Sequence, residues 1–433
     1  MNIISIVLQL IASLSILVLV HEFGHFIFAK IFKVRIEKFY LFFNPWFSLF
    51  KFKPKNSDTE YGLGWLPLGG YVKIAGMIDE SMDKEQMAKP PQPWEFRSQP
   101  AWKRLIIMVA GVVFNFLLAI AIYVGILFHW GEEYVRMQDV TTGMEFSQTA
   151  KDIGFEDGDI LLSADGVLLE RFDEDTFRRI IESKEVKVLR SGDTASVSIP
   201  DDLVTRLLQD KKGFADFRIP FVVKSVLPNS PAERAGLMPG DSVVAVNDSA
   251  AFLFDCISAF AAHKEKPVLL TVIRLGQEEK ITVIPDSAGK VGVPFKTPKD
   301  LFPVQKIRYS FIESIPAGIQ KGIKRLTGNV SDMKYVFTKE GFENMGGFRT
   351  MARFFSYPFD AQTFWTSTAL LSIVLAFINI LPIPALDGGH VMFLLYEVIT
   401  RRKPSQRVME KAQIIGMMFL LTLMLYANLN DWL

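Results

Sequence analysis

The segment His21-Glu22-Phe23-Gly24-His25 has the residue types and the spacing of an H-E-x-x-H motif. Positions i and i+4 share one face of a helix, so the imidazoles of His21 and His25 can both reach one metal ion. Glu22 lies one position on, near enough to hold a water molecule at that metal. A hydrogen-bonded polar cluster that helps helices pack is the alternative. Three ionisable groups within an apolar helix are costly unless they are satisfied, which favours the metal.

Two histidines leave a zinc ion short of ligands, because catalytic zinc sites usually combine three protein ligands with water. The best candidate for the third ligand is Asp387, in the segment NILPIPALDGGH. His21 follows about 18 apolar residues, or ~27 Å of helix, and Asp387 lies about 23 residues into its own apolar segment. Both side chains are therefore expected at a similar depth. His390 follows close behind and competes with Asp387 for this role.

Pro382 and Pro384 interrupt the apolar segment just before Asp387. Proline removes a backbone donor and opens a helix. Irregular backbone at membrane depth is tolerated only where protein or a water-filled cavity surrounds it. A water-filled pocket beside the metal is what hydrolysis requires.

Membrane spans are indicated by the composition of the whole chain. Its 433 residues are 49% hydrophobic and 22% charged, and their mean hydropathy is +0.23. The net charge of +1 excludes a strong field that would attract nucleic acid, and the single cysteine excludes a disulfide framework. Four segments are long and apolar enough to cross a bilayer: Ile3–Ile31, Trp102–Trp130, Phe364–Ile399 and Ala412–Leu429. The first lacks the features of a cleavable signal peptide, so a permanent helix is expected.

Lys and Arg residues fall into two stretches at and between the spans. Thirteen lie from Lys30 to Arg104 and five from Arg401 to Lys411, whereas the two ends of the chain carry none. Because cytoplasmic loops carry an excess of Lys and Arg, both stretches are expected on the cytoplasmic side. Both termini and the large segment 131–363 then lie outside the cytoplasm.

The segment 131–363 contains an internal repeat. GFEDGDI from Gly154 recurs as GLMPGDS from Gly236, 82 residues further on, and a β-prone run follows each copy. With SPAERAG in the second copy, the pattern resembles tandem PDZ domains, which can take an extended peptide end against a sheet edge. The alternative is two small β domains without a ligand.

The segment Val34–Gly76 is aromatic and β-prone and contains the run YGLGWLPLGGYVKI. Gly69 and Gly70 precede an alternating strand, where glycine permits the close approach of another backbone. A protease must hold its substrate extended, because a helix hides its carbonyl groups. Addition of the substrate as a strand at this edge would unwind it beside the metal. The alternative is a hairpin that only packs on the cytoplasmic side.

Two further patterns leave their role open. The apolar spacing over residues 304–327 predicts an amphipathic helix, which can either lie on the membrane surface or pack against the β domains. Gly111 and Asn115 in the second apolar segment are interpreted as helix-packing residues, because a small residue allows close approach and Asn can bond across helices.

Together, HEFGH in the first span, GVVFN in the second, the PDZ-like repeat and NILPIPALDGGH in the third resemble the site-2 protease family, of the bacterial regulator of sigma-E protease type. The resemblance covers nearly the whole chain. It implies an intramembrane zinc metalloprotease with one catalytic Zn²⁺ that cleaves single-span membrane proteins, such as anti-sigma factors or signal-peptide remnants. It also implies that the PDZ-like pair limits access for bulky substrates and that the β element is membrane-reentrant.

The resemblance also assigns roles to individual residues. The positions that match the family's metal site are the ligands His21, His25 and Asp387 and the general base Glu22. The positions that match its substrate site are Asn379, Pro382 and Pro384. Two more expected substrate contacts, Gly69 and Gly70, come from the β edge described above.

The predicted fold class is a polytopic α-helical membrane protein with four transmembrane helices, a membrane-associated β element and two extracytoplasmic PDZ-like α+β domains. The predicted order is helix 1 (1–33), the β region (34–101), helix 2 (102–130), the PDZ-like domains (131–218 and 219–300), an amphipathic helical linker (301–363), helix 3 (364–399), a cytoplasmic loop (400–411) and helix 4 (412–430). The expected location is the inner membrane of a bacterium. The expected partners are the lipid bilayer, membrane protein substrates and peptide ends at the PDZ-like domains, and not nucleic acid.

Two other classes of protein fit part of these observations. A non-catalytic scaffold could use the PDZ-like pair to gather partners in the membrane, but the intact H-E-x-x-H and LDGGH segments disfavour it. A metal transporter would need a polar path through several spans, whereas the ionisable residues cluster at one depth.

Overall fold

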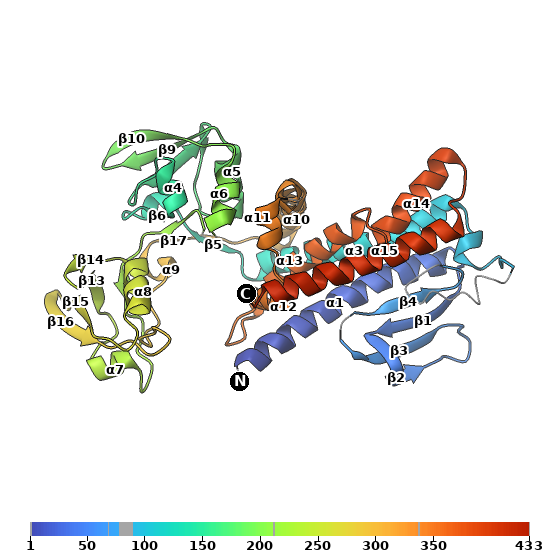
Figure 1. Ribbon diagram of the computed structural model, residues 1–433, viewed down its shortest axis with the longest axis horizontal. Helices are drawn as coiled ribbons and strands as arrows, with labels where there is room; N and C mark the ends of the chain where they lie inside the picture. Colours follow the sequence, from blue (N-terminus) through green and yellow to red (C-terminus); the bar gives the residue numbers. More distant parts are fainter. Residues whose placement is uncertain (1, 68, 78–89, 211–212, 337, 433) are drawn as a thin grey trace. The chain divides into compact units, whose positions relative to one another are not determined.

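The computed structural model describes residues 2–67, 69–77, 90–210, 213–336 and 338–432. Lys84 and Lys89, two of the basic residues counted above, lie outside these ranges. The chain divides into two compact units, one made of Met1–Gly131 with Arg308–Leu433 and the other of Glu132–Ile307 (Figure 1). All the candidate metal and substrate residues belong to the first unit.

Four long apolar helices form the frame of the first unit, and by length and composition each can cross a membrane. At 1.5 Å per residue, helices of this size span roughly 30–45 Å, enough for the hydrocarbon core of a bilayer. The chain is therefore a polytopic membrane protein. The four helices are α1 (Asn2–Ile31), α3 (Ala101–His129), α13 (Ala361–Ile380) and α15 (Gln406–Asn430).

The predicted third span is two helices in the structure. After α13 ends at Ile380, residues 381–386 form an irregular loop, and α14 then runs from Asp387 to Thr400. The two prolines in this loop supply no backbone N–H, and Ala385 has a φ of +81°, which a regular helix does not accommodate. Asp387 therefore begins a helix instead of lying within one.

Small residues let α1 and α3 approach closely. A Cβ atom on Gly24 would lie 2.6 Å from the carbonyl oxygen of Ala110 and 3.0 Å from the Cα of Gly111. The two helices therefore meet backbone to backbone, as small residues allow at helix interfaces. Gly24 lies between His21 and His25, so this contact brings both histidines against α3.

A buried ion pair ties the start of α3 to the end of α14. An Nη2 group of Arg104 donates to Glu397 at 2.5 Å, and both side chains are largely buried, with 9% and 12% exposed. The Nε group of Arg104 also donates to the carbonyl of Gln99. Around the same end of the bundle, Leu394 of α14 packs with Ile107 and Ala29, so three helices share one apolar cluster.

A four-stranded sheet follows α1, with the strand order β2-β3-β1-β4 (Figure 1). β1 pairs in parallel with β3 and antiparallel with β4, so β4 lies at one edge of the sheet. Phe39 and Val72 are partners across β1 and β4, and the ring of Phe39 meets that of Phe26 on α1. The strands are β1 (Ile36–Leu41), β2 (Phe43–Phe52), β3 (Glu60–Leu66) and β4 (Tyr71–Ile74).

The second unit contains two copies of one small α+β arrangement, at the positions of the sequence repeat. In the first copy, the last strand returns to pair with the first. Its elements are β6 (Met144–Phe146), α4 (Gln148–Asp152), β7 (Ile160–Ala164), β8 (Val167–Leu168), α5 (Glu174–Glu182), β9 (Glu185–Arg190), β10 (Asp193–Ser198), α6 (Leu203–Asp210) and β11 (Ala215–Phe217).

The second copy, in which every residue is described, follows the same order but has no helix corresponding to α6. Its end also returns to the first strand, because Val223 pairs with Phe295. Its elements are β12 (Phe221–Val222), α7 (Pro231–Ala235), β13 (Ser242–Val246), β14 (Ser249–Ala250), α8 (Leu253–Ala262), β15 (Val268–Arg274) and β16 (Gln277–Val283). Each copy has its own apolar core, so each has the organisation of a small domain.

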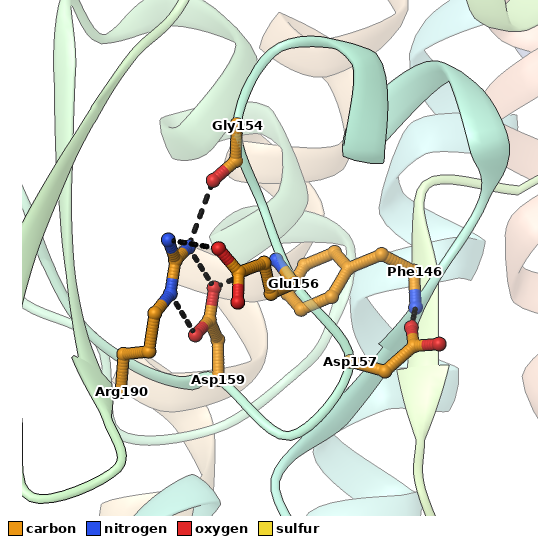
Figure 2. Close-up of polar contacts among 6 residues, drawn as sticks. All are labelled: Phe146, Gly154, Glu156, Asp157, Asp159 and Arg190. Atoms are coloured by element: carbon orange, nitrogen blue, oxygen red, sulfur yellow. Dashed lines mark hydrogen bonds and ion pairs between the residues drawn. The ribbon is translucent and has the colours of Figure 1, made fainter.

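One arginine holds the glycine turn of the first copy. Arg190, the last residue of β9, donates from Nε and Nη2 to the two carboxylate oxygens of Asp159 at 2.8 and 2.7 Å. The same guanidinium reaches Glu156 and the carbonyl of Gly154 (Figure 2). The bidentate pair thus closes the turn that precedes β7.

The second copy uses the same arrangement. Arg274, the last residue of β15, donates to both oxygens of Asp241 at 2.8 and 2.7 Å and to the carbonyl of Gly236. The sequence repeat around Gly154 and Gly236 is therefore also a repeat of tertiary contacts. The arginine pair explains the two aspartates, and positive φ angles explain the glycines at 154, 158, 236 and 240.

The amphipathic helix expected over residues 304–327 begins later than the apolar spacing suggested. Val304–Ile307 is a strand, β17, which pairs with β5 (Glu132–Val135), and α10 runs from Phe311 to Val336. Ser310 and Glu313 fix the helix start, because the N–H of Ser310 donates to the Glu313 carboxylate and the N–H of Glu313 donates to the Ser310 hydroxyl. The prediction was therefore wrong for its first seven residues and too short at its end.

Short elements complete the chain and connect the larger ones. They are the 3₁₀ turns η1 (Phe96–Ser98) and η2 (Met137–Asp139) and the helices α9 (Pro298–Leu301), α11 (Lys339–Glu343) and α12 (Phe348–Ala352). The C-terminal end of α15 is tied to α12, because the Asp431 carboxylate accepts the backbone N–H groups of Gly347, Arg349 and Thr350.

Candidate metal centre

The H-E-x-x-H histidines and Asp387 meet inside the first unit. Asp387 Oδ2 lies 3.1 Å from His21 Nε2 and 3.3 Å from His25 Nε2, and the two Nε2 atoms are 3.2 Å apart. The histidines come from one face of α1 and the aspartate from the first turn of α14. Both histidines are buried, and 15% of the Asp387 side chain is exposed.

This triangle fits a tetrahedral zinc ion. Ligand bonds of about 2.0–2.1 Å at tetrahedral angles place the ligand atoms roughly 3.3 Å from one another. The three observed separations lie close to that value. Asp387 Oδ2 is also buried without a hydrogen-bond partner among the residues that the structure describes. A cation among these three atoms would satisfy that oxygen, and the set of two imidazoles and a carboxylate suits zinc.

The tautomer of His25 follows from its other ring nitrogen. His25 Nδ1 lies 2.8 Å from the carbonyl oxygen of Ile107 on α3. Because a carbonyl only accepts, Nδ1 must carry the proton, and Nε2 keeps its lone pair on the side of Asp387. This outer contact fixes the orientation that a metal ligand needs.

Asn115 plays the corresponding part for His21. The side-chain amide nitrogen of Asn115 lies 3.2 Å from His21 Nδ1, and its Oδ1 is buried without a partner in the described part of the chain. If His21 Nε2 binds the metal, Nδ1 carries a proton that needs an acceptor. A half-turn of the Asn115 amide supplies that acceptor and satisfies Oδ1. Helix packing alone, as expected from the sequence, does not describe this contact.

Gly111 of α3 lies directly against the two imidazole rings. A Cβ atom at this position would lie 2.8 Å from Cε1 of His21 and closer still to Nε2 of His25. The residue is therefore glycine for a reason tied to the metal site, in addition to the close approach of α1 and α3.

A pocket of about 450 Å³ opens beside the triangle. Glu22 lines it and is half-buried, one helix position from His21. Residues 70–74 along β4 form a second part of the lining, and residues 385–387 with Gln413 form a third. The site thus adjoins a cavity that is bordered by a strand edge.

Only some of the other residues predicted from the sequence to contact the substrate or the metal line this pocket. Asn379 is the last residue but one of α13 and is buried, with its amide nitrogen 3.4 Å from His21 Nε2. Gly70 lines the pocket, whereas Gly69 and the two prolines do not. His390 lines the pocket as well, but the group of close ligand atoms contains Asp387 instead.

Glycine at positions 69 and 70 is explained by the chain's own packing. A Cβ atom on Gly70 would lie 2.7 Å from the carbonyl oxygen of Tyr40 on β1 and 3.0 Å from Val18 on α1. Gly69 has a φ of +152°, and a Cβ there would lie 2.8 Å from the ring of Phe43. The close approach predicted from Gly70 is thus an approach of β1 and α1.

Several residues that line the pocket could not be identified from the sequence, among them Gln413 and Met108. Gln413 lines the pocket from α15, although its only signal was one amide near the start of an apolar run. Met108 of α3 also lines the pocket, and a methionine within an apolar helix gives no signal at all.

Apolar helices of membrane-spanning length that bring an H-E-x-x-H pair against a carboxylate define a membrane-embedded metallohydrolase. Residues 9–423 match the model of peptidase family M50. The chain is 31% identical to a Vibrio cholerae protein whose name describes a zinc metalloprotease, with 98% of this chain and 97% of that protein covered.

Two further relatives carry more specific names. A Haemophilus influenzae protein named regulator of sigma E protease is 27% identical, and a Yersinia pestis protein named protease RseP is 29% identical. Each comparison covers 98% of this chain and 97% of the relative. The chain therefore belongs to peptidase family M50, the site-2 proteases, and is a zinc metalloprotease.

Proposed function

We propose that this protease hydrolyses peptide bonds within the membrane-spanning segments of single-span membrane proteins. The observation that carries the proposal is the triangle of His21, His25 and Asp387, set between helices of spanning length and open to a pocket bordered by β4. His21, His25 and Asp387 hold the zinc, which when bound polarises the scissile carbonyl and lowers the pKa of water toward ~7.

Glu22 is the general base in this proposal. It accepts a proton from the attacking water and delivers that proton to the nitrogen of the leaving amine. The carbon–nitrogen bond of the substrate breaks, and a carboxylate and an amine are released. Asn379 lies beside His21 and positions the substrate, while Pro382 and Pro384 keep the segment before Asp387 out of a helix.

The β4 edge is the place where the substrate is held extended. β4 pairs with β1 on one side, and residues 70–74 border the pocket. A strand added there receives backbone hydrogen bonds from β4 and exposes its carbonyls beside the metal. The sheet is interpreted as a membrane-reentrant element, because β2 carries a group of exposed apolar side chains: Trp46, Phe47, Leu49, Phe50 and Phe52.

The two small domains of the second unit act as PDZ-like modules that limit which substrates reach the membrane site. Their repeated order of strands and helices and the return of each chain end to its first strand support this interpretation. The basic stretches between the first two spans and between the last two spans support an orientation with both termini and these domains on the periplasmic side of a bacterial inner membrane. Anti-sigma factors and signal-peptide remnants are suitable substrates.

The test is Glu22→Gln, which keeps the shape of the side chain and removes its basicity. Membrane fractions from cells with this variant should accumulate uncleaved single-span fragments, and the purified variant should still bind one zinc per chain. Glu278→Gln, at an exposed position on β16, is the matched control and should cleave like the parent. Turnover of a membrane substrate by the Glu22→Gln protein would refute the assignment, and a non-catalytic scaffold would show no difference between the two variants.

A further inference from the structure

Gln413 is a buried amide on the last long helix that borders the metal pocket. Only 7% of the residue is exposed, and it shares the pocket lining with His21, Glu22 and Asp387. It is the eighth residue of α15 and directly precedes the apolar run that begins at Ile414. A buried amide in such a helix is costly unless its polar groups have partners.

The oxygen of this amide holds the loop that leads into Asp387. Gln413 Oε1 accepts the backbone N–H of Ala385 at 3.3 Å. Ala385 has a φ of +81°, a conformation that an alanine adopts only when its surroundings impose it. One turn further along α15, a side chain on Gly416 would overlap the carbonyl of Pro384. The helix is therefore docked directly on this loop.

The nitrogen of the same amide has no acceptor among the residues that the structure describes. Within the described part of the chain, Gln413 Nε2 donates no hydrogen bond to protein, and it is not among the buried polar atoms sealed from solvent. Because Gln413 lines the cavity, a chain bound in the cavity lies beside this amide. Its two N–H groups are donors without a protein acceptor beside the metal.

An extended peptide in this pocket needs such a donor. A strand carries hydrogen-bonding groups along both of its edges, and β4 can pair with only one of them. The carbonyl groups on the other edge turn toward the remaining walls, which include Gln413 and residues 385–387. Polar groups buried there without partners would weaken binding.

We infer that Gln413 positions the substrate, by donating from Nε2 to a backbone carbonyl of the bound peptide while Oε1 holds the Ala385 loop in place. The inference rests on the proposed function and names one more residue of that same site. Because the contact is made to the peptide backbone, it does not select a side chain. It favours any substrate segment that can leave its helical form at this depth.

The test measures peptide binding separately from turnover. In the Glu22→Gln background, a dye-labelled synthetic peptide with one apolar segment of about 20 residues is titrated in detergent micelles and followed by fluorescence anisotropy. Gln413→Glu keeps an oxygen for Ala385 and removes the donor, so the Kd should rise about 3- to 10-fold with zinc content unchanged. Gln413→Leu removes both contacts, so zinc affinity should fall as well. Gln406→Glu, at an exposed position on the same helix, is the control and should change neither quantity.

Turnover gives an independent second measurement. With Glu22 intact, Gln413→Glu should raise KM by the same factor and leave kcat within about twofold, the pattern of a lost ground-state contact. Equal Kd and KM for Gln413→Glu and the parent would overturn the inference while leaving the proposed function in place. A parent protein that neither binds nor cleaves the peptide would instead overturn the proposed function, and this inference with it.

Discussion

Replacing Gly111 by Ala should weaken zinc binding without unfolding the protein. The new methyl group would lie 2.8 Å from Cε1 of each imidazole, whereas carbon atoms normally approach to about 3.5–4.0 Å. The rings must therefore move away by roughly 0.7–1.2 Å, although a zinc site tolerates deviations of only about 0.2 Å. The expected loss is about 10- to 100-fold in zinc affinity, or roughly 1.4–2.7 kcal/mol.

The assay is competition for zinc with a chromophoric chelator, combined with circular dichroism to follow helix content. Gly125→Ala is a matched control on the same helix, because a Cβ atom at position 125 meets no other atom within 4 Å. Both changes should raise helix propensity by about 1 kcal/mol, so only the effect on the imidazoles separates them. A Gly111→Ala protein that binds zinc within twofold of the parent would refute the steric reasoning.

Three further predictions concern contacts away from the metal. Arg274→Met leaves the carboxylate of Asp241 buried without its partner and should destabilise the second small domain by about 2–3 kcal/mol. The loss should appear as faster hydrogen exchange along β15. Lys280→Met, which removes an exposed ion pair, is the control and should leave the exchange rates along β15 unchanged. Burial by itself would raise the pKa of Asp241, but hydrogen bonds from Arg274 and from a backbone N–H outweigh burial and lower it. The pair therefore stabilises the second small domain above pH ~4, and this stabilisation should be lost as the pH falls further. A domain stability that stays constant as the pH falls through this range would contradict the prediction. Asp431→Ala removes the carboxylate that accepts backbone N–H groups at the start of α12, so the amides of Gly347 and Thr350 should exchange roughly 5- to 10-fold faster with solvent. Unchanged exchange rates would show that this carboxylate does not stabilise the start of α12.

The three residues that could hold a metal were found in the sequence because their chemistry and their periodicity coincide. Helical spacing alone puts His21 and His25 on one face, and depth counted along two apolar segments was enough to select Asp387 over more distant candidates. The structure brings these three residues together. The repeat around Gly154 and Gly236 was also visible, because a tight turn before a strand demands the same residue types in both copies.

Other features depend on tertiary contacts that leave no local pattern. Asn115 and Gln413 are single amides in apolar helices, and such residues serve helix packing as readily as they serve a site. The reason for glycine at Gly70 is the approach of β1 and α1, which no sequence window contains. The start of α10 was missed because apolar spacing continues through β17, whereas the capping pair of Ser310 and Glu313 decides where the helix begins.

The buried ion pair of Arg104 and Glu397 has a mechanical consequence for α14. This helix carries Asp387 at its first residue and Glu397 near its last, about 15 Å apart along the axis, so it is fastened at both ends. Contacts at both ends of α14 oppose tilting of the helix and sliding along its axis. Whatever movement admits a polypeptide to the cavity has to be taken up by the neighbouring loop, by α15 or by the sheet, while the carboxylate stays in register with the two imidazoles.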